Sequence, residues 1–267
     1  WSSDVCSSDL SHIMGAELRQ TKGRITFFDT IRGISVVSMI LFHFTYDLFF
    51  ISHVKLTWFT PLLMQIWIPS ISYPFIFIAG CMCAFSKDSF KRAGVYGLVA
   101  LAIFAATTFA KVDTPITFGI FFCMASCTLV EALISRFAVT PKGYSAAILL
   151  LLIFVVCIPI STGHIGIGNM VFSLPKELYQ TPYLAWAGFP SPSFSSGDYY
   201  PLLPYLFLYV SGAAFNRQLK AEGYPNWMKT FSLPLITEMG KHSLIVYILH
   251  QPILLLIALF VSQNIVF

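Results

Sequence analysis

Charged residues are scarce in this chain. Of its 267 residues, only 10% are Asp, Glu, Lys or Arg, against about 25% in an ordinary soluble protein. Hydrophobic residues make up 57%, so too little charge is left to cover the surface of a water-soluble globule of this length. The deficit excludes a soluble enzyme, a disordered chain and a nucleic-acid-binding protein. It indicates a polytopic membrane protein whose main partner is the lipid bilayer.

Metal-binding patterns are lacking as well, although the chain has six cysteines. Cys123 and Cys127 are about one helical turn apart, but no acidic residue or histidine stands close by to complete a metal site. Five cysteines fall inside apolar runs, where cysteine behaves as a small hydrophobic residue. They are Cys81, Cys83, Cys123, Cys127 and Cys157. We therefore expect them to pack in the interior, and we expect no bound metal.

The first residues lack the apolar segment of a signal peptide. Residues 1–14 read WSSDVCSSDLSHIM, with a repeated Ser-Ser-Asp. We expect residues 1–20 to be a non-native or disordered leader, and residues 21–267 to form the membrane domain.

Long apolar runs predict about seven transmembrane helices. Crossing a hydrocarbon core of about 30 Å takes roughly 17–25 residues. Runs of about this length stand near 27–51, 59–85, 94–110, 115–137, 144–161, 199–215 and 243–262. We expect an all-α polytopic membrane protein with these helices in one bundle, to within one span.

The positions of the basic residues predict the orientation. Cytoplasmic loops carry an excess of Lys and Arg. With the N-terminus inside, the inner segments hold Arg19, Lys22, Arg24, Lys87, Lys91, Arg92, Arg136, Lys142, Arg217, Lys220, Lys229 and Lys241, and the outer ones hold Lys55, Lys111 and Lys176. This alternation predicts a cytoplasmic N-terminus and a C-terminus on the outer side.

A long outer segment, 162–198, is rich in Gly, Pro, Ser and aromatic residues. Its aromatic side chains could form a belt at the membrane interface or stack on a sugar ring, and the belt is the favoured interpretation. These residues are Tyr179, Tyr183, Trp186 and Phe189.

The first apolar run carries four ionisable residues, Asp29, Arg32, His43 and Asp47. At 100° per residue they share a stripe about 60° wide. A charge at the centre of a membrane helix costs about 2.5–3.5 kcal/mol, so such residues are rare without a partner or a function.

Two interpretations of this stripe stay open. Asp29 and Arg32 are three residues apart near the inner end, so they could pair as a topological anchor or bind a substrate. Asp47 follows His43 by one turn, where its carboxylate could orient the imidazole. The alternative for His43 is a hydrogen-bonded structural histidine.

The last run places Ser243, Tyr247 and His250 on one helical face. His250 could serve function or helix packing equally. Another histidine, His53, stands on the outer side after the first run.

Four motifs together resemble a known family. The Asp29-x-x-Arg32-Gly33 pattern followed by His43 is similar to the opening of the transmembrane acyltransferases. The set RITFFDTIRG, ITFGI (116–120), DYYPLLPY (198–205) and GKHSLIVYILHQPIL (240–254) resembles the heparan-α-glucosaminide N-acetyltransferase catalytic-domain family, chiefly its small bacterial members. The resemblance spans roughly residues 22–262.

The resemblance implies an integral-membrane acyltransferase in the cytoplasmic (inner) membrane of a bacterium. It would transfer an acetyl group from cytoplasmic acetyl-CoA, the co-substrate, to a sugar, glycan or amino-sugar acceptor at the outer face. No nucleic acid and no metal take part, and the resemblance leaves the oligomeric state open.

Matched motif by motif, the resemblance implies site residues too. His43 matches the histidine of the first span, but His53 also falls near the region of the acetyl-carrying histidine of animal members, so both stay candidates. We assign catalysis to His43, Asp47 and His53, and substrate binding to Asp29, Arg32, Asp198, Tyr199 and His250.

One departure keeps other functions open. Bacterial relatives commonly continue the fourth-span motif as Phe-Gly-Ile-Leu-His, whereas this chain has Phe121-Phe122 after Ile120. Either that histidine is dispensable, or this member has a changed substrate or reduced activity. The alternative functions are a multi-pass transporter, against which the lack of an internal repeat argues, and a non-catalytic membrane protein.

Overall fold

A computed structural model describes residues 24–111 and 114–264 of the chain. The leader expected at 1–20 lies outside these described residues. The helices are α2 (Thr26–Phe50), α3 (Pro61–Cys81), α4 (Ser89–Ala110), α5 (Ile120–Phe137), α6 (Tyr144–Cys157), α7 (Leu202–Glu222), α8 (Asn226–Thr230), α9 (Pro234–Lys241) and α10 (Ser243–Asn264). Short 3-10 helices are η1 (Met82–Phe85), η2 (Ile158–Thr162), η3 (Lys176–Tyr179) and η4 (Pro182–Ala187), and the strands are β1 (His164–Ile167) and β2 (Met170–Ser173).

Six helical stretches among the described residues are long and apolar enough to cross a membrane. They are Thr26–Phe50, Pro61–Phe85, Ser89–Ala110, Ile120–Phe137, Tyr144–Thr162 and Ser243–Gln263. Each coincides with a run found in the sequence. The expectation of an all-α polytopic membrane protein is confirmed.

The remaining predicted span, 199–215, corresponds to α7, which begins at Leu202 and continues to Glu222. Polar residues lower the hydropathy of this helix, and its neighbours accept their hydrogen bonds. Ser211 Oγ donates to the Ala147 carbonyl at 2.7 Å, and Asn216 Nδ2 donates to the Cys81 carbonyl at 2.7 Å. Because the polar side chains of Ser211 and Asn216 are hydrogen-bonded to neighbouring parts of the protein, a helix of lower hydropathy can be accommodated here.

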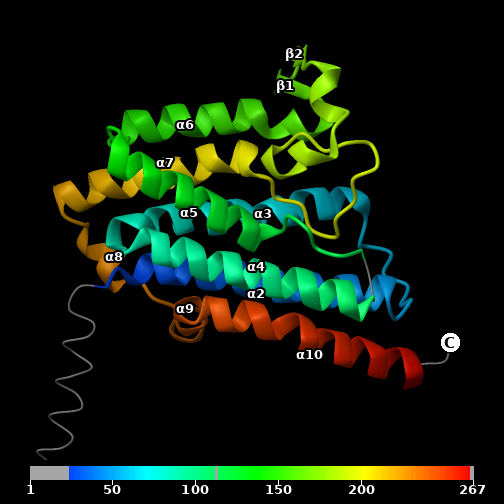
Figure 1. Cartoon of the computed structure of the whole chain (residues 1–267). Coiled ribbons are helices and arrows are strands. Elements are labelled where there is room, and N and C mark those ends of the chain that lie inside the picture. Colours follow the sequence, from blue (N-terminus) through cyan, green and yellow to red (C-terminus); the bar gives the residue numbers. More distant parts are fainter. Residues whose placement is uncertain (1–23, 112–113, 265–267) are drawn as a thin grey trace, which may run out of the picture. The chain divides into compact units, whose positions relative to one another are not determined.

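By their contacts, the helices expected in one bundle form two compact units. Unit one combines α2 with the last three helices, α8, α9 and α10. Unit two runs from Lys55 to Gly223 and holds α3 to α7 and the β1–β2 hairpin. The grouping follows from the chain path, because the chain leaves unit one after α2 and returns to it at α8 (Figure 1).

In unit one, glycines bring the backbones of α2 and α9 into contact. A Cβ added at Gly33 would lie 1.9 Å from the carbonyl oxygen of Ile236, and one at Gly240 would lie 1.8 Å from that of Asp29. Only glycine allows this approach. The buried hydroxyls of Thr30 and Thr237 hydrogen-bond across the same interface at 2.7 Å.

In unit two, α7 packs against α3 and α6. Its Gly212 comes so close to α3 that an added Cβ would lie 2.1 Å from the Phe77 carbonyl oxygen. Tyr209 is fully buried, and its hydroxyl hydrogen-bonds to Thr128 on α5 at 2.7 Å. The segment between α6 and α7 is not one irregular loop, because it contains the β1–β2 hairpin and three 3-10 helices, η2, η3 and η4.

Candidate functional site

Two histidines from distant parts of the chain meet in unit one. His43 lies on α2 and His250 on α10, helices that are neighbours although they stand near opposite ends of the sequence (Figure 1). The ring centroids are 5.1 Å apart and the rings are tilted by 58°. His250 is buried, and His43 is half-buried. The sequence indicated both residues separately but not that their rings are in contact.

A backbone hydrogen bond determines which nitrogen of His250 carries the proton. Nδ1 lies 2.5 Å from the carbonyl oxygen of Tyr247. A carbonyl oxygen only accepts, so Nδ1 donates, and Nε2 of the neutral ring then presents its lone pair. That Nε2 atom is buried and has no hydrogen-bond partner among the described residues.

A second buried acceptor stands next in sequence. Gln251 Nε2 donates to both carboxylate oxygens of Asp47, at 3.3 and 3.1 Å. This contact fixes the amide, and Gln251 Oε1 is then buried without a hydrogen-bond partner among the described residues. We call His250 Nε2 and Gln251 Oε1 the acceptor pair. Both atoms belong to residues of α10 that contact α2.

Asp47 is only 1% exposed, deep between α2 and α10. We predicted that it orients His43, and the contact seen at its carboxylate is with Gln251. Gln251 is not among the site residues predicted from the sequence. The sequence does contain a feature that indicates it, because Gln251 is a polar amide in a mostly apolar helix and directly follows His250.

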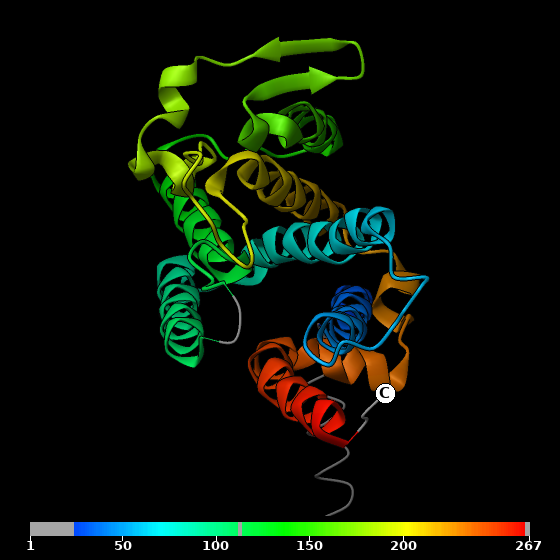
Figure 2. The same cartoon turned by 90° about the vertical axis from the view of Figure 1, so that its right-hand side faces the viewer.

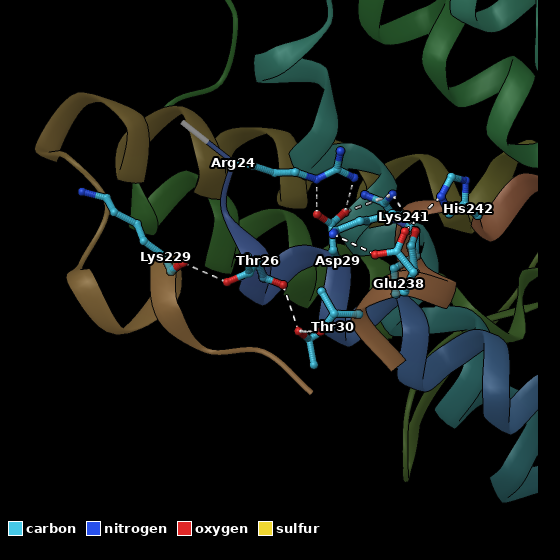
Figure 3. A network of polar contacts seen from close by, with 11 residues as sticks. Arg24, Thr26, Asp29, Thr30, Lys229, Glu238, Lys241 and His242 are labelled. Atoms are coloured by element: carbon cyan, nitrogen blue, oxygen red, sulfur yellow. Dashed lines mark hydrogen bonds and ion pairs between the residues drawn. The ribbon is translucent and has the colours of Figure 1, made fainter. Parts of the chain in front are cut away.

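Asp29 and Arg32, near the start of α2, contact other protein groups. The Asp29 carboxylate accepts hydrogen bonds from Arg24, at 2.5 Å from Nε and 3.1 Å from Nη2. Arg32 Nη1 lies 3.6 Å from the same carboxylate and donates to the Gly240 carbonyl at 3.2 Å. Figure 3 shows Asp29 in a polar network together with residues of α9 such as Glu238. These contacts favour the anchor interpretation for Asp29 and Arg32.

His53 is exposed just after the end of α2. It has a left-handed backbone conformation, with φ of 54°. The ring seen next to His250 is that of His43, ten positions earlier in the chain.

Asp198 and Tyr199 belong to unit two, where two of the quoted motifs meet. Tyr200 N donates to the Phe118 carbonyl at 2.7 Å, and Asp198 Oδ2 accepts from Ile120 N at 3.3 Å, at the start of α5. Desolvation raises the pKa of Asp198 to about 6, although the Ile120 hydrogen bond acts in the opposite direction. Tyr199 donates its hydroxyl to the Ala185 carbonyl at 2.6 Å.

Phe122 stands at the position where the motif resemblance implies a histidine. Its ring lies 4.8 Å from that of Phe118, and Phe118 stacks on Phe194 at 5.8 Å. Phe122 is therefore part of an aromatic cluster with Phe118 and Phe194.

Unit two also holds a buried ion pair that is not among the features predicted from the sequence. Glu131 on α5, which is 2% exposed, pairs with Arg217 on α7 and accepts a hydrogen bond from Ser135 at 2.8 Å. Glu131 is the only acidic residue of the 115–137 run, which was the available signal. The pair holds α5 and α7 together.

Within residues 24–111 and 114–264, no group of three or more His, Cys, Asp or Glu side chains is placed to hold a metal ion.

Residues 24–252 match the model of a family described as heparan-alpha-glucosaminide N-acetyltransferase, catalytic. The match covers most of the chain and includes every residue assigned above to catalysis or substrate binding. Comparisons with curated proteins and with solved structures found no match.

Proposed function

Because the chain belongs to the heparan-alpha-glucosaminide N-acetyltransferase catalytic family, we propose that it transfers an acetyl group from acetyl-CoA to the amino group of a sugar acceptor. The observation that carries this proposal is the contact between His43 and His250 inside a membrane-spanning unit, beside the acceptor pair. The family match also favours a transferase over a transporter.

His43 is the proposed catalytic residue. In one route it removes a proton from the attacking amine and passes it to the thioester sulfur, so that the amine nitrogen displaces CoA as its thiol from the thioester carbon. In the other, a ring nitrogen of His43 displaces CoA first, and the amine then takes the acetyl group from the imidazole. Both routes place His43 against the reacting carbonyl.

The acceptor pair supports an amine rather than a hydroxyl as the acceptor. Before attack, a neutral primary amine offers two N–H groups to the two acceptors, His250 Nε2 and Gln251 Oε1, and its lone pair stays free; in the first route one of these protons then moves to His43 as the new bond forms. A hydroxyl has one donor and would leave one buried acceptor unsatisfied, at a cost of about 1–3 kcal/mol. That cost corresponds to roughly a 5- to 150-fold preference for the amine.

The sidedness of the reaction is proposed from the basic residues. Twelve of sixteen Lys and Arg residues stand in segments expected on the cytoplasmic side, which supports entry of acetyl-CoA from the cytoplasm and transfer at the outer face of a bacterial inner membrane.

The test is acetyl transfer by reconstituted full-length protein with labelled acetyl-CoA and a glucosamine-terminated oligosaccharide. We expect His43→Ala to lower the rate by about 10²–10⁴-fold, the usual contribution of general acid–base catalysis. His164→Ala is the matched control, because His164 is an exposed histidine of the hairpin in unit two, and it should keep full activity. His53→Ala tests the other histidine candidate; because His53 is exposed outside α2, we expect it to keep nearly full activity.

Two further measurements complete the test. An acceptor with a hydroxyl in place of the amine should be acetylated more slowly by the unaltered protein. Release of CoA in a burst without acceptor would identify the route through acetylated His43. Full transfer by a correctly inserted His43→Ala protein would refute the assignment, and loss in His53→Ala alone would move it to His53.

A further inference from the structure

The β1–β2 hairpin of unit two has an apolar face that is mostly exposed, with Ile165 half-buried at one end of it. In an antiparallel pair, residues directly opposite each other share a face, and successive residues alternate between faces. The register pairs Ile165 with Phe172 and Ile167 with Met170, so one face is entirely apolar. The side chains of Ile167, Met170 and Phe172 are 52%, 75% and 68% exposed.

The opposite face of the hairpin is different. It carries His164 opposite Ser173 and Gly166 opposite Val171, so the hairpin is amphipathic. A two-stranded hairpin is marginally stable in water unless an apolar face is covered. An exposed apolar face of this kind indicates a contact with something other than water.

The hairpin directly follows an apolar helical stretch. It follows α6 and η2, a stretch that is long and apolar enough to span a membrane and is mostly unburied by protein. The exposed side chains of this helix include Ile148, Leu149 and Leu152. Figures 1 and 2 show the strands at one end of α6, on the side away from α7.

The sequence around the hairpin suits a bilayer surface. No Asp, Glu, Lys or Arg occurs between Lys142 and Lys176, a stretch that covers α6 and the whole hairpin. Beyond it, Tyr183 and Trp186 of η4 are exposed. Aromatic residues of this kind are enriched where hydrocarbon meets water.

We propose that the hairpin is a membrane-interface anchor, with the side chains of Ile165, Ile167, Met170 and Phe172 inserted at the boundary between lipid headgroups and acyl chains. Its other face points to water, as in an interfacial amphipathic element. The anchor holds the start of the segment that leads to Asp198 and Tyr199 against the bilayer. It acts independently of whether the protein transfers acetyl groups.

The test uses single nitroxide labels on full-length protein in phosphatidylcholine–phosphatidylglycerol liposomes. Cysteines are introduced one at a time as Met170→Cys, Val171→Cys, Phe172→Cys and Ser173→Cys, in a background that carries Cys6→Ser and Cys157→Ser. Collision rates with oxygen, which partitions into lipid, and with a water-soluble nickel chelate are then measured. Leu149→Cys on α6 gives the lipid reference, and Glu177→Cys gives the water reference.

We expect the oxygen-to-nickel ratio to alternate along the strand and to be roughly threefold or more higher at 170 and 172 than at 171 and 173. Equal exposure of all four labels to nickel would overturn the proposal. So would shielding of 170 and 172 from both reagents together with dipolar coupling between labels, because a second copy of the chain would then cover the face.

Discussion

Four ionisable residues share one stripe of α2, and their surroundings differ from one end of the helix to the other. At its N-terminal end, Asp29 and Arg32 are engaged with Arg24 and with the backbone of α9. Farther along, His43 contacts a second histidine, and Asp47 fixes Gln251. One stripe therefore contains an anchor and a candidate reaction site, because different segments of unit one pack against each part.

The buried carboxyl group of Asp198 predicts that the stability of the folded protein depends on pH. Desolvation raises the pKa of Asp198 in the folded chain from an ordinary value near 3.8 to about 6. Between these values the folded state binds more protons than the unfolded state, so its stability falls as the pH rises from about 4 to 6 and is then constant. We expect Asp198→Asn to remove this change, which is on the order of 1–3 kcal/mol.

The measurement is thermal unfolding of both proteins in detergent across this pH range. The variant should match the unaltered protein near pH 4 and be the more stable of the two above pH 7. The assignment fails if the difference between their midpoints does not change with pH.

At the scale of elements, the α2–α9 contact depends on glycine. Because a Cβ at Gly240 would lie 1.8 Å from the Asp29 carbonyl oxygen, Gly240→Ala must push the helices apart. We expect a loss of about 1–3 kcal/mol or more from overpacking. Gly94→Ala is the matched control, because Gly94 lies in α4 with nothing within 4 Å of the added atom.

The control substitution should leave stability unchanged or raise it by up to about 1 kcal/mol, as alanine favours the helix. Unfolding midpoints of the two variants in detergent give the comparison. Equal midpoints for both would show that the close approach of α2 and α9 does not hold unit one together.

At the scale of the whole molecule, α7 determines the topology. If α7 crosses the membrane together with the six apolar helices, the two ends of the chain lie on opposite sides, and if it does not, they lie on the same side. The charge pattern predicts a cytoplasmic N-terminus and an outer C-terminus. Reporters fused to each end, alkaline phosphatase for the outer side and a fluorescent protein for the cytoplasm, measure this.

We expect phosphatase activity only from the C-terminal fusion and fluorescence only from the N-terminal one. Insertion of a reporter after Gly223, at the end of unit two, tests α7 separately and should report the cytoplasm. Both ends on the same side would reduce the count to six spans and remove α7 from the membrane-crossing set.

The sequence by itself determined the class of the protein and the positions of its apolar helices. The thickness of the hydrocarbon core and the free-energy cost of burying a charge both constrain local composition. Apolar runs such as 27–51 can therefore be identified without knowledge of the fold. The family resemblance can also be found from the sequence alone, because each of its motifs is a short contiguous segment. The stripe from Asp29 to Asp47 also followed from helical periodicity alone.

Only the tertiary structure decided which distant side chains meet. His43 and His250 are more than 200 residues apart, and nothing in local composition brings α2 and α10 together. The acceptor pair likewise depends on the Tyr247 carbonyl and on Asp47, which fix the His250 ring and the Gln251 amide. The position of the polar helix α7 also depends on the tertiary structure. Backbone carbonyls of neighbouring elements accept the hydrogen bonds of Ser211 and Asn216, and the hydropathy of α7 alone does not indicate these contacts.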